Sequence, residues 1–97
     1  MKFVNYAKYI KDQEKLSALR PAHREYAAGL MASGKLVAAG PFTDGSGALF
    51  IYEADTLQEA ESLFSSDPFA AGGVIASYDI APWQVLGVNA DLLRPAP

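Results

Sequence analysis

His23 is the only histidine in the chain, and imidazole is the side chain best suited to exchange protons near neutral pH. The sequence contains no cysteine, which excludes disulfide bonds and thiol catalysis. One histidine with scattered carboxylates is too sparse a set for a metal site, so we expect neither a metal nor a cofactor. Any chemistry that this protein performs is therefore expected to pass through His23.

Asp67 occupies an electrostatically awkward position. It follows directly after a predicted helix, and the C-terminal end of a helix carries partial negative charge, so this carboxylate needs a compensating partner. An imidazole that donates its N–H to Asp67 would be such a partner. The backbone could also be the partner, because an aspartate before a proline often caps the next helical turn. Here Asp67 would accept a hydrogen bond from the backbone N–H of Phe69 or Ala70. Both roles can coexist, with one carboxylate oxygen for each.

Other side chains near these two leave alternatives open. Arg20 could bind an anionic group through its planar donors, or it could be a solvated residue at the start of a helix. Tyr9 could help to line a pocket for an aromatic ring, although aromatic residues in strands usually belong to the core. Ser66 lies beside Asp67 but lacks the G-x-S-x-G context of an activated nucleophile, so acyl transfer is not favoured. Three further aromatic residues could likewise line a pocket or belong to the core: Tyr6, Tyr52 and Trp83.

The hydrophobic pattern predicts the elements that position these residues. Strands are expected over residues 2–10, 35–42, 48–54 and 74–80. One helix is expected with Pro21 in its first turn and its end at Gly34. A second is expected from a cap at Thr56, with Asp55 as a competing cap, to the residues just before Pro68. This order is the ferredoxin-like βαββαβ arrangement, an α+β fold in which two helices cover one face of a four-stranded antiparallel sheet.

The strands are apolar at consecutive positions, which is typical of a sheet that is covered on both faces. The helices cover only one face, and 51% of the residues are hydrophobic, more than a single small core needs. We therefore expect a homodimer in which the bare sheet faces pack together. The whole chain, 1–97, is expected to be a single domain with a core of about 2–86 and a C-terminal tail over 87–97.

Charge and hydropathy exclude several classes of partner. The net charge is −3 and no basic run is present, so nucleic-acid binding is not expected. No apolar stretch approaches the length of a membrane span, and the N-terminus lacks the pattern of a secretory signal. We expect a cytoplasmic protein with no membrane partner.

Four short motifs then occur in a characteristic order: Arg-Pro-Ala-His at 20–23, Ala-Gly-Pro at 39–41, Asp-Pro-Phe at 67–69 and Ile-Ala-Pro-Trp at 80–83. Together with the βαββαβ order, they resemble the YCII-related (YciI-like) family of small dimeric α+β barrel proteins. The resemblance covers about residues 2–86. It implies a ferredoxin-like protomer, a dimer and an active site built from a His–Asp pair, which would be His23 and Asp67 here. It also implies a range of chemistries, since relatives include a dehydrochlorinase, and the wider superfamily includes isomerases and cofactor-free monooxygenases.

The sequence thus predicts a small-molecule enzyme that performs cofactor-free acid–base chemistry of the elimination, isomerisation or hydrolysis class. His23 would move the proton and Asp67 would orient it. The alternative is a non-enzymatic protein of the same fold that binds a small ligand or serves as an accessory. The residues expected to contact the substrate are Arg20, Ser66, Phe69 and Tyr9.

Overall fold

Four antiparallel strands and three helices make up the computed structural model, which describes residues 1–95. The last two residues of the expected tail, 96 and 97, lie outside the described residues. The elements follow one another as β1 (Lys2–Tyr9), α1 (Gln13–Ala32), β2 (Leu36–Pro41), β3 (Gly47–Glu53), α2 (Leu57–Ser65), α3 (Pro68–Ala71) and β4 (Ile75–Trp83).

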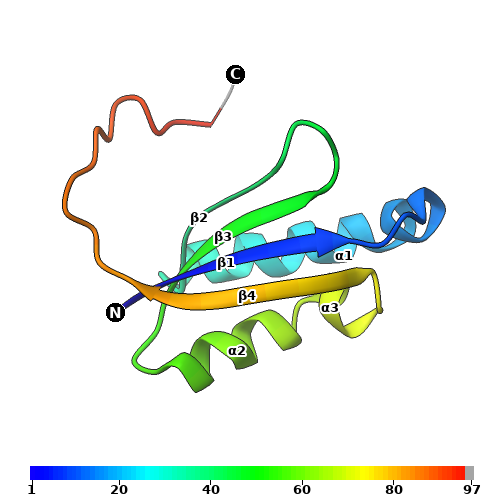
Figure 1. Ribbon diagram of the computed structural model, residues 1–97, viewed down its shortest axis with the longest axis horizontal. Helices are drawn as coiled ribbons and strands as arrows, with labels where there is room; N and C mark the ends of the chain where they lie inside the picture. Colours follow the sequence, from blue (N-terminus) through cyan, green and yellow to red (C-terminus); the bar gives the residue numbers. More distant parts are fainter. Residues whose placement is uncertain (96–97) are drawn as a thin grey trace.

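The sheet has the strand order β2-β3-β1-β4, with every neighbouring pair antiparallel (Figure 1). The two central strands, β1 and β3, are far apart in sequence and pair from Lys2 opposite Glu53 to Lys8 opposite Gly47. Residues of α1 and α2 pack on the buried residues of one sheet face. The predicted α+β arrangement with a four-stranded antiparallel sheet and helices on one face is therefore confirmed, and the short helix α3 is added to it.

Alternation along β1 shows which face is buried. Phe3, Asn5 and Ala7 are buried on the helix side, whereas Tyr6 between them is exposed on the other side. Burial of the apolar side chains provides the main stabilisation of the fold. The larger core cluster joins the sheet to the helices through Phe3, Ala7, Leu36, Ala48, Phe50, Tyr52, Ala54, Ala60 and Phe64, and a smaller one consists of Leu16, Phe69 and Val74.

The first helix begins well before the predicted start. Asp12 is its N-cap, and the Asp12 side chain accepts a hydrogen bond from the Lys15 backbone N–H. Pro21 consequently lies inside α1 rather than in its first turn, so that prediction was wrong. Leu16 is buried against Phe69 and Val74, and this contact stabilises the turns of α1 that precede Pro21. The stabilisation from this packing exceeds the cost of the backbone hydrogen bond that Pro21 cannot donate.

The second helix follows the predicted signals closely. Thr56 is the N-cap of α2 and accepts from the Glu59 backbone N–H at 3.1 Å, while the Glu59 carboxylate accepts from the Asp55 N–H at 3.0 Å. The strand β4 continues to Trp83, three residues beyond the predicted end at Ile80. After Trp83 the chain leaves the sheet as an irregular segment (Figure 1). None of the helices in the described part is both long and apolar enough to span a membrane.

Candidate active site

A cavity of about 440 Å³ lies between α1 and the β2–β3 side of the sheet, and His23 is part of its wall. Helix α1 contributes one side of it and strands β2 and β3 the other, while β1 and α3 each add an aromatic residue, Tyr9 and Phe69. A volume of this size suits a small molecule. The lining residues are Tyr9, Arg20, His23, Arg24, Ala27, Ala28, Met31, Leu36, Ala39, Gly40, Pro41, Ala48, Phe50 and Phe69.

The His23 imidazole contacts Asp67 at the inner side of this cavity. Nδ1 of His23 lies 2.7 Å from Oδ1 of Asp67, within hydrogen-bonding distance. The imidazole is 15% exposed and the Asp67 side chain 3%, so the pair is shielded from bulk water but the ring is still accessible. When Nδ1 carries the proton and donates the hydrogen bond to Asp67, Nε2 keeps a free lone pair.

Asp67 is held in place by the backbone as well. It is the N-cap of α3, with Pro68 in the first helical turn, and its Oδ1 accepts from the Phe69 N–H at 2.9 Å. The predicted capping role is therefore confirmed. One detail of that prediction was wrong, since the same oxygen, not one oxygen for each role, serves both His23 and Phe69. The two hydrogen bonds compensate for the burial of this carboxylate.

Two phenylalanine rings fix the plane of the imidazole. Phe69 is stacked on His23 with the ring centroids 4.0 Å apart and the planes 3° from parallel. Phe50 meets His23 edge-on, at 6.1 Å and 86°. Because the hydrogen bond holds one edge of the ring and the stack holds its face, the imidazole has little freedom to rotate.

Three tyrosines close to Asp67 have raised pKa values. Burial is the main cause at Tyr9, where the charge of Asp67 adds to the effect and Arg20 opposes it. Burial and the Asp67 charge also raise the pKa of Tyr26, whose hydroxyl donates to the Leu63 carbonyl at 2.6 Å. The pKa of Tyr52 is raised chiefly by burial. All three phenols therefore remain neutral at physiological pH.

The structure brings together most of the residues singled out from the sequence. Arg20, Tyr9 and Phe69 line the same cavity as His23. Ser66 does not line it, because it is exposed at the C-cap of α2. The other aromatic candidates lie elsewhere. Tyr52 is buried in the core, and Tyr6 and Trp83 lie on the opposite face of the sheet.

Three residues of this region were missed by the sequence analysis. Arg24, which was not singled out from the sequence, is exposed and also lines the cavity one helical turn after Arg20, a spacing that the sequence does show. Phe50 lies in a strand with no polar signal. Asn5 is completely buried, and neither polar atom of its amide makes a hydrogen bond of normal geometry, although it lies near enough to Tyr52 to lower the pKa of that phenol slightly. Its signal was a polar residue at an inward position of β1.

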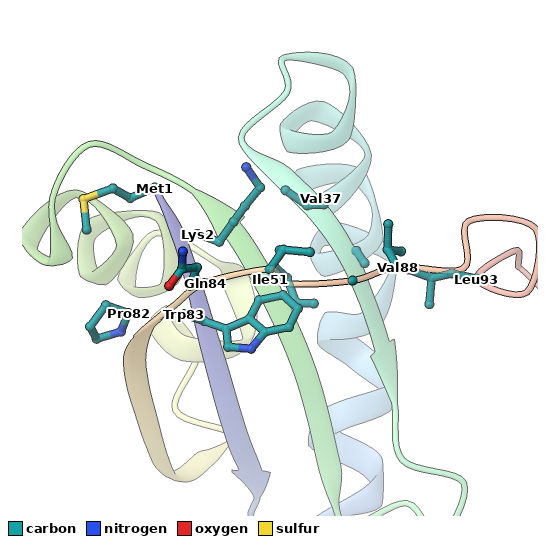
Figure 2. A pocket seen from close by; sticks show the side chains of 12 residues that line it. Met1, Lys2, Val37, Ile51, Pro82, Trp83, Gln84, Val88 and Leu93 are labelled. Atoms are coloured by element: carbon teal, nitrogen blue, oxygen red, sulfur yellow. The ribbon is translucent and has the colours of Figure 1, made fainter.

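A larger hollow of about 810 Å³ lies on the other face of the sheet (Figure 2). Its walls come from the strands and from the segment after β4, and they are apolar apart from Lys2, Gln84 and the N-terminus. Trp83 and Ile51 both line it, and Val88 and Leu93 of the tail line it further to the right in Figure 2. Neither His23 nor Asp67 lines this hollow, so the His23–Asp67 pair belongs to the smaller cavity.

The fold defines a class of proteins. A βαββαβ protomer with this sheet is of the dimeric α+β-barrel type, and solved structures share it. The chain belongs to the YCII-related domain family, whose model matches residues 1–84. Among curated proteins, it is similar to the uncharacterized protein YjpA of Bacillus subtilis (strain 168), with 39% identity over 63 residues, which cover 65% of this chain and 73% of YjpA.

Two solved structures are similar to this one. The first is 5-chloro-2-hydroxyhydroquinone dehydrochlorinase (TftG) from Burkholderia phenoliruptrix AC1100, in complex with 2,5-dihydroxybenzoquinone. The TM-score is 0.77 and the identity 26%, over 87% of this chain and 94% of TftG. The second is Rv0793 from Mycobacterium tuberculosis, with a TM-score of 0.57 and 12% identity over 90% of this chain and 100% of Rv0793, a likeness of fold alone.

Proposed function

We propose that this protein is a small-molecule enzyme that performs acid–base chemistry without a cofactor, with His23 as the proton-transferring group. The observation that carries the proposal is the 2.7 Å contact between His23 Nδ1 and the buried Asp67 at the wall of a ligand-sized cavity. A buried carboxylate that fixes one nitrogen of an accessible imidazole is the arrangement by which histidine acts as a general base. The likeness to a dehydrochlorinase at 26% identity supports an enzymatic role.

The geometry supports a division of labour between the two residues. Nε2 of His23 takes a proton from an acidic O–H or C–H group of the substrate, and Asp67 stabilises the imidazolium that forms. In an isomerisation, His23 returns that proton to a different atom of the same molecule. In an elimination, the electron pair left on the substrate expels a leaving group as an anion, and the proton is later released to water. Proton transfer of this kind contributes about 10²–10⁴-fold in rate.

The direct test uses the substrate named for the similar dehydrochlorinase. The purified protein is incubated with 5-chloro-2-hydroxyhydroquinone, and chloride release is followed together with the absorbance of the quinone. We expect catalysed release, with His23→Ala and Asp67→Asn each lowering kcat by about 10²-fold or more. A folded His23→Ala variant with undiminished turnover of any substrate of the protein would refute the mechanism.

The alternative is a binding protein that uses the same cavity. It predicts a ligand whose affinity is the same in the wild type, His23→Ala and Asp67→Asn, with no turnover in any of them. Oxygen consumption during the reaction would instead indicate a cofactor-free monooxygenase. These outcomes differ, so measurements on the wild type, His23→Ala and Asp67→Asn distinguish the acid–base enzyme, the binding protein and the monooxygenase.

We also propose that the chain forms a homodimer through the sheet face opposite the helices. Its neighbours are of the dimeric α+β-barrel type. The face carries exposed apolar side chains, among them Tyr6, Val37 and Trp83, which are each 44–47% exposed. The tail beside it exposes Leu86, Val88 and Leu92 still more. Apolar surface that is contiguous with a hollow of this size is usually covered by a partner.

Sedimentation at micromolar concentration tests the dimer. We expect twice the mass of the chain, and we expect Ile51→Arg on this face to give monomers. The control is Ala18→Arg, on an exposed position of α1, which should leave the mass unchanged. A stable wild-type monomer would overturn the proposal. The cytoplasmic location expected from the sequence stays a prediction.

A further inference from the structure

The cavity beside His23 has a charge opposite to that of the protein as a whole. Its charged lining residues are Arg20 and Arg24, and no aspartate or glutamate of residues 1–95 lines it. The chain carries a net charge of −3. No acidic side chain of the described residues lies on the cavity surface, and Asp67 adjoins it only behind His23, so the two arginines make the local field favourable to an anion.

The two arginines flank His23 on one face of α1. They are one helical turn apart, a spacing at which side chains are neighbours on a helix. Within the described part of the chain neither arginine makes an ion pair. Asp67, the carboxylate in contact with His23, has its Oδ1 already engaged by His23 and by the Phe69 N–H. The two guanidinium groups are therefore not neutralised by an ion pair within the described residues.

The rest of the wall is mainly apolar. Phe69 and Phe50 supply aromatic surface around the imidazole, and Tyr9 meets Phe69 edge-on at 5.5 Å and 78°. Beside Phe50 in the sheet, the small residues of β2 continue the wall that faces α1: Ala39, Gly40 and Pro41. These walls would accommodate a planar, apolar body, while the arginines offer paired N–H donors to an oxyanion at one end of it.

From this arrangement we infer that Arg20 and Arg24 form an anion subsite, and that the substrate of the proposed enzyme is a small planar organic oxyanion such as an acidic phenol, an enol or a carboxylate. The inference rests on the proposed function for the chemistry but concerns binding alone. With the oxyanion at the arginines and the planar body between α1 and the sheet surface formed by Phe50 and β2, an acidic hydrogen of the same molecule can face Nε2 of His23. The negative charge that grows on deprotonation then stays beside the guanidinium groups.

The test compares an anion with a neutral molecule of the same shape. The probes are 2,5-dihydroxybenzoquinone, which is anionic at neutral pH, and its neutral ether 2,5-dimethoxybenzoquinone, with affinities measured by calorimetry at low and high NaCl. We expect the wild type to prefer the anion by about 10-fold or more, as one charge-assisted contact gives, and salt to reduce that preference. Arg20→Gln and Arg24→Gln should each weaken binding of the anion about 10-fold and leave the ether unaffected.

Two matched variants distinguish the loss of a positive charge in the cavity from a general effect of substitution on the fold. Arg24→Lys keeps the charge and should keep most of the affinity for the anion. Lys11→Gln removes an exposed charge outside the cavity and should change nothing. Equal binding of anion and ether by the wild type would overturn the inference, as would an anion preference that survives both arginine-to-glutamine changes. The inference would also be overturned if none of three anions bound at millimolar concentration: 2,5-dihydroxybenzoquinone, benzoate and salicylate. The His23→Ala variant, which removes turnover if the proposed function holds, should retain the anion preference, so the two proposals fail separately.

Discussion

Nδ1 of His23 lies 2.7 Å from Oδ1 of Asp67, although the two residues are 44 positions apart in the chain. The same oxygen accepts the Phe69 N–H, so the carboxylate that orients the imidazole also starts the short helix α3. Phe69 in turn stacks on the imidazole. His23, Asp67 and Phe69 thus form a closed set of contacts in which each member positions the next.

The hydrogen bond between His23 and Asp67 should contribute to stability. Asp67→Asn keeps an oxygen for the Phe69 N–H but removes the charge that the imidazole meets. We expect the free energy of unfolding to fall by about 1.5–3 kcal/mol, the usual size for a hydrogen bond to a charged group. In urea denaturation, a double-mutant cycle with His23→Ala should give a coupling of at least about 0.5 kcal/mol. Asp79→Asn, at an exposed position of β4, is the control, and additive effects of the two site changes would contradict the prediction.

Phe69 should matter for the rate as well as for stability. Phe69→Leu keeps an apolar side chain but removes the stacked face of the imidazole, so the ring gains freedom to rotate. We expect a loss of stability smaller than the about 3–5 kcal/mol typical of Phe→Ala, and a fall in kcat that exceeds any rise in KM. Phe42→Leu is a matched control, because Phe42 packs on Tyr6 away from the cavity. An unchanged kcat in Phe69→Leu would show that the stack has no role in positioning.

The buried amide of Asn5 should weaken the fold. Neither of its polar atoms has a hydrogen-bond partner among the described residues, and a buried unpaired amide costs about 1–3 kcal/mol. Asn5→Leu, of similar size, should therefore raise the free energy of unfolding, and Asn5→Asp should lower it. A destabilised Asn5→Leu protein would mean that the amide is satisfied in solution. If stabilisation is accompanied by lost activity, Asn5 has been retained for function.

Glu53 should make the fold sensitive to acid. Lys2 and then the N-terminal amine lower the pKa of Glu53 to about 2. A depressed pKa in the folded state gives stability above the unfolded pKa of about 4.3, and this is lost as the pH falls through that value toward 2. Glu53→Gln should flatten the stability profile in that interval and leave the profile near neutral pH parallel to that of the wild type. Because the pair is partly exposed, 0.5 M NaCl should reduce the difference. Equal slopes below pH 4.5 in the two proteins would contradict this assignment.

Much of the architecture could be predicted because its signals are local. Turn glycines, the cap at Thr56 and runs of apolar residues mark where each strand and the second helix lie, and the order of elements restricts the topology to a ferredoxin-like sheet. The start of α1 was misplaced for the opposite reason. A proline favours the first helical turn locally, but the burial of Leu16 against Phe69 and Val74 is a contact between distant segments that lengthens the helix past it.

The sequence by itself determined which side chains were available for chemistry. A single histidine, an aspartate before a proline and the absence of cysteine left few choices. Only the tertiary structure decided how these residues are combined. The stacking of Phe69 on the imidazole, the shared oxygen of Asp67 and the positive wall formed by Arg20 and Arg24 depend on how α1 crosses β2 and α3. The way in which one element packs across another depends on side chains of the whole core, so it cannot be predicted from any local sequence pattern.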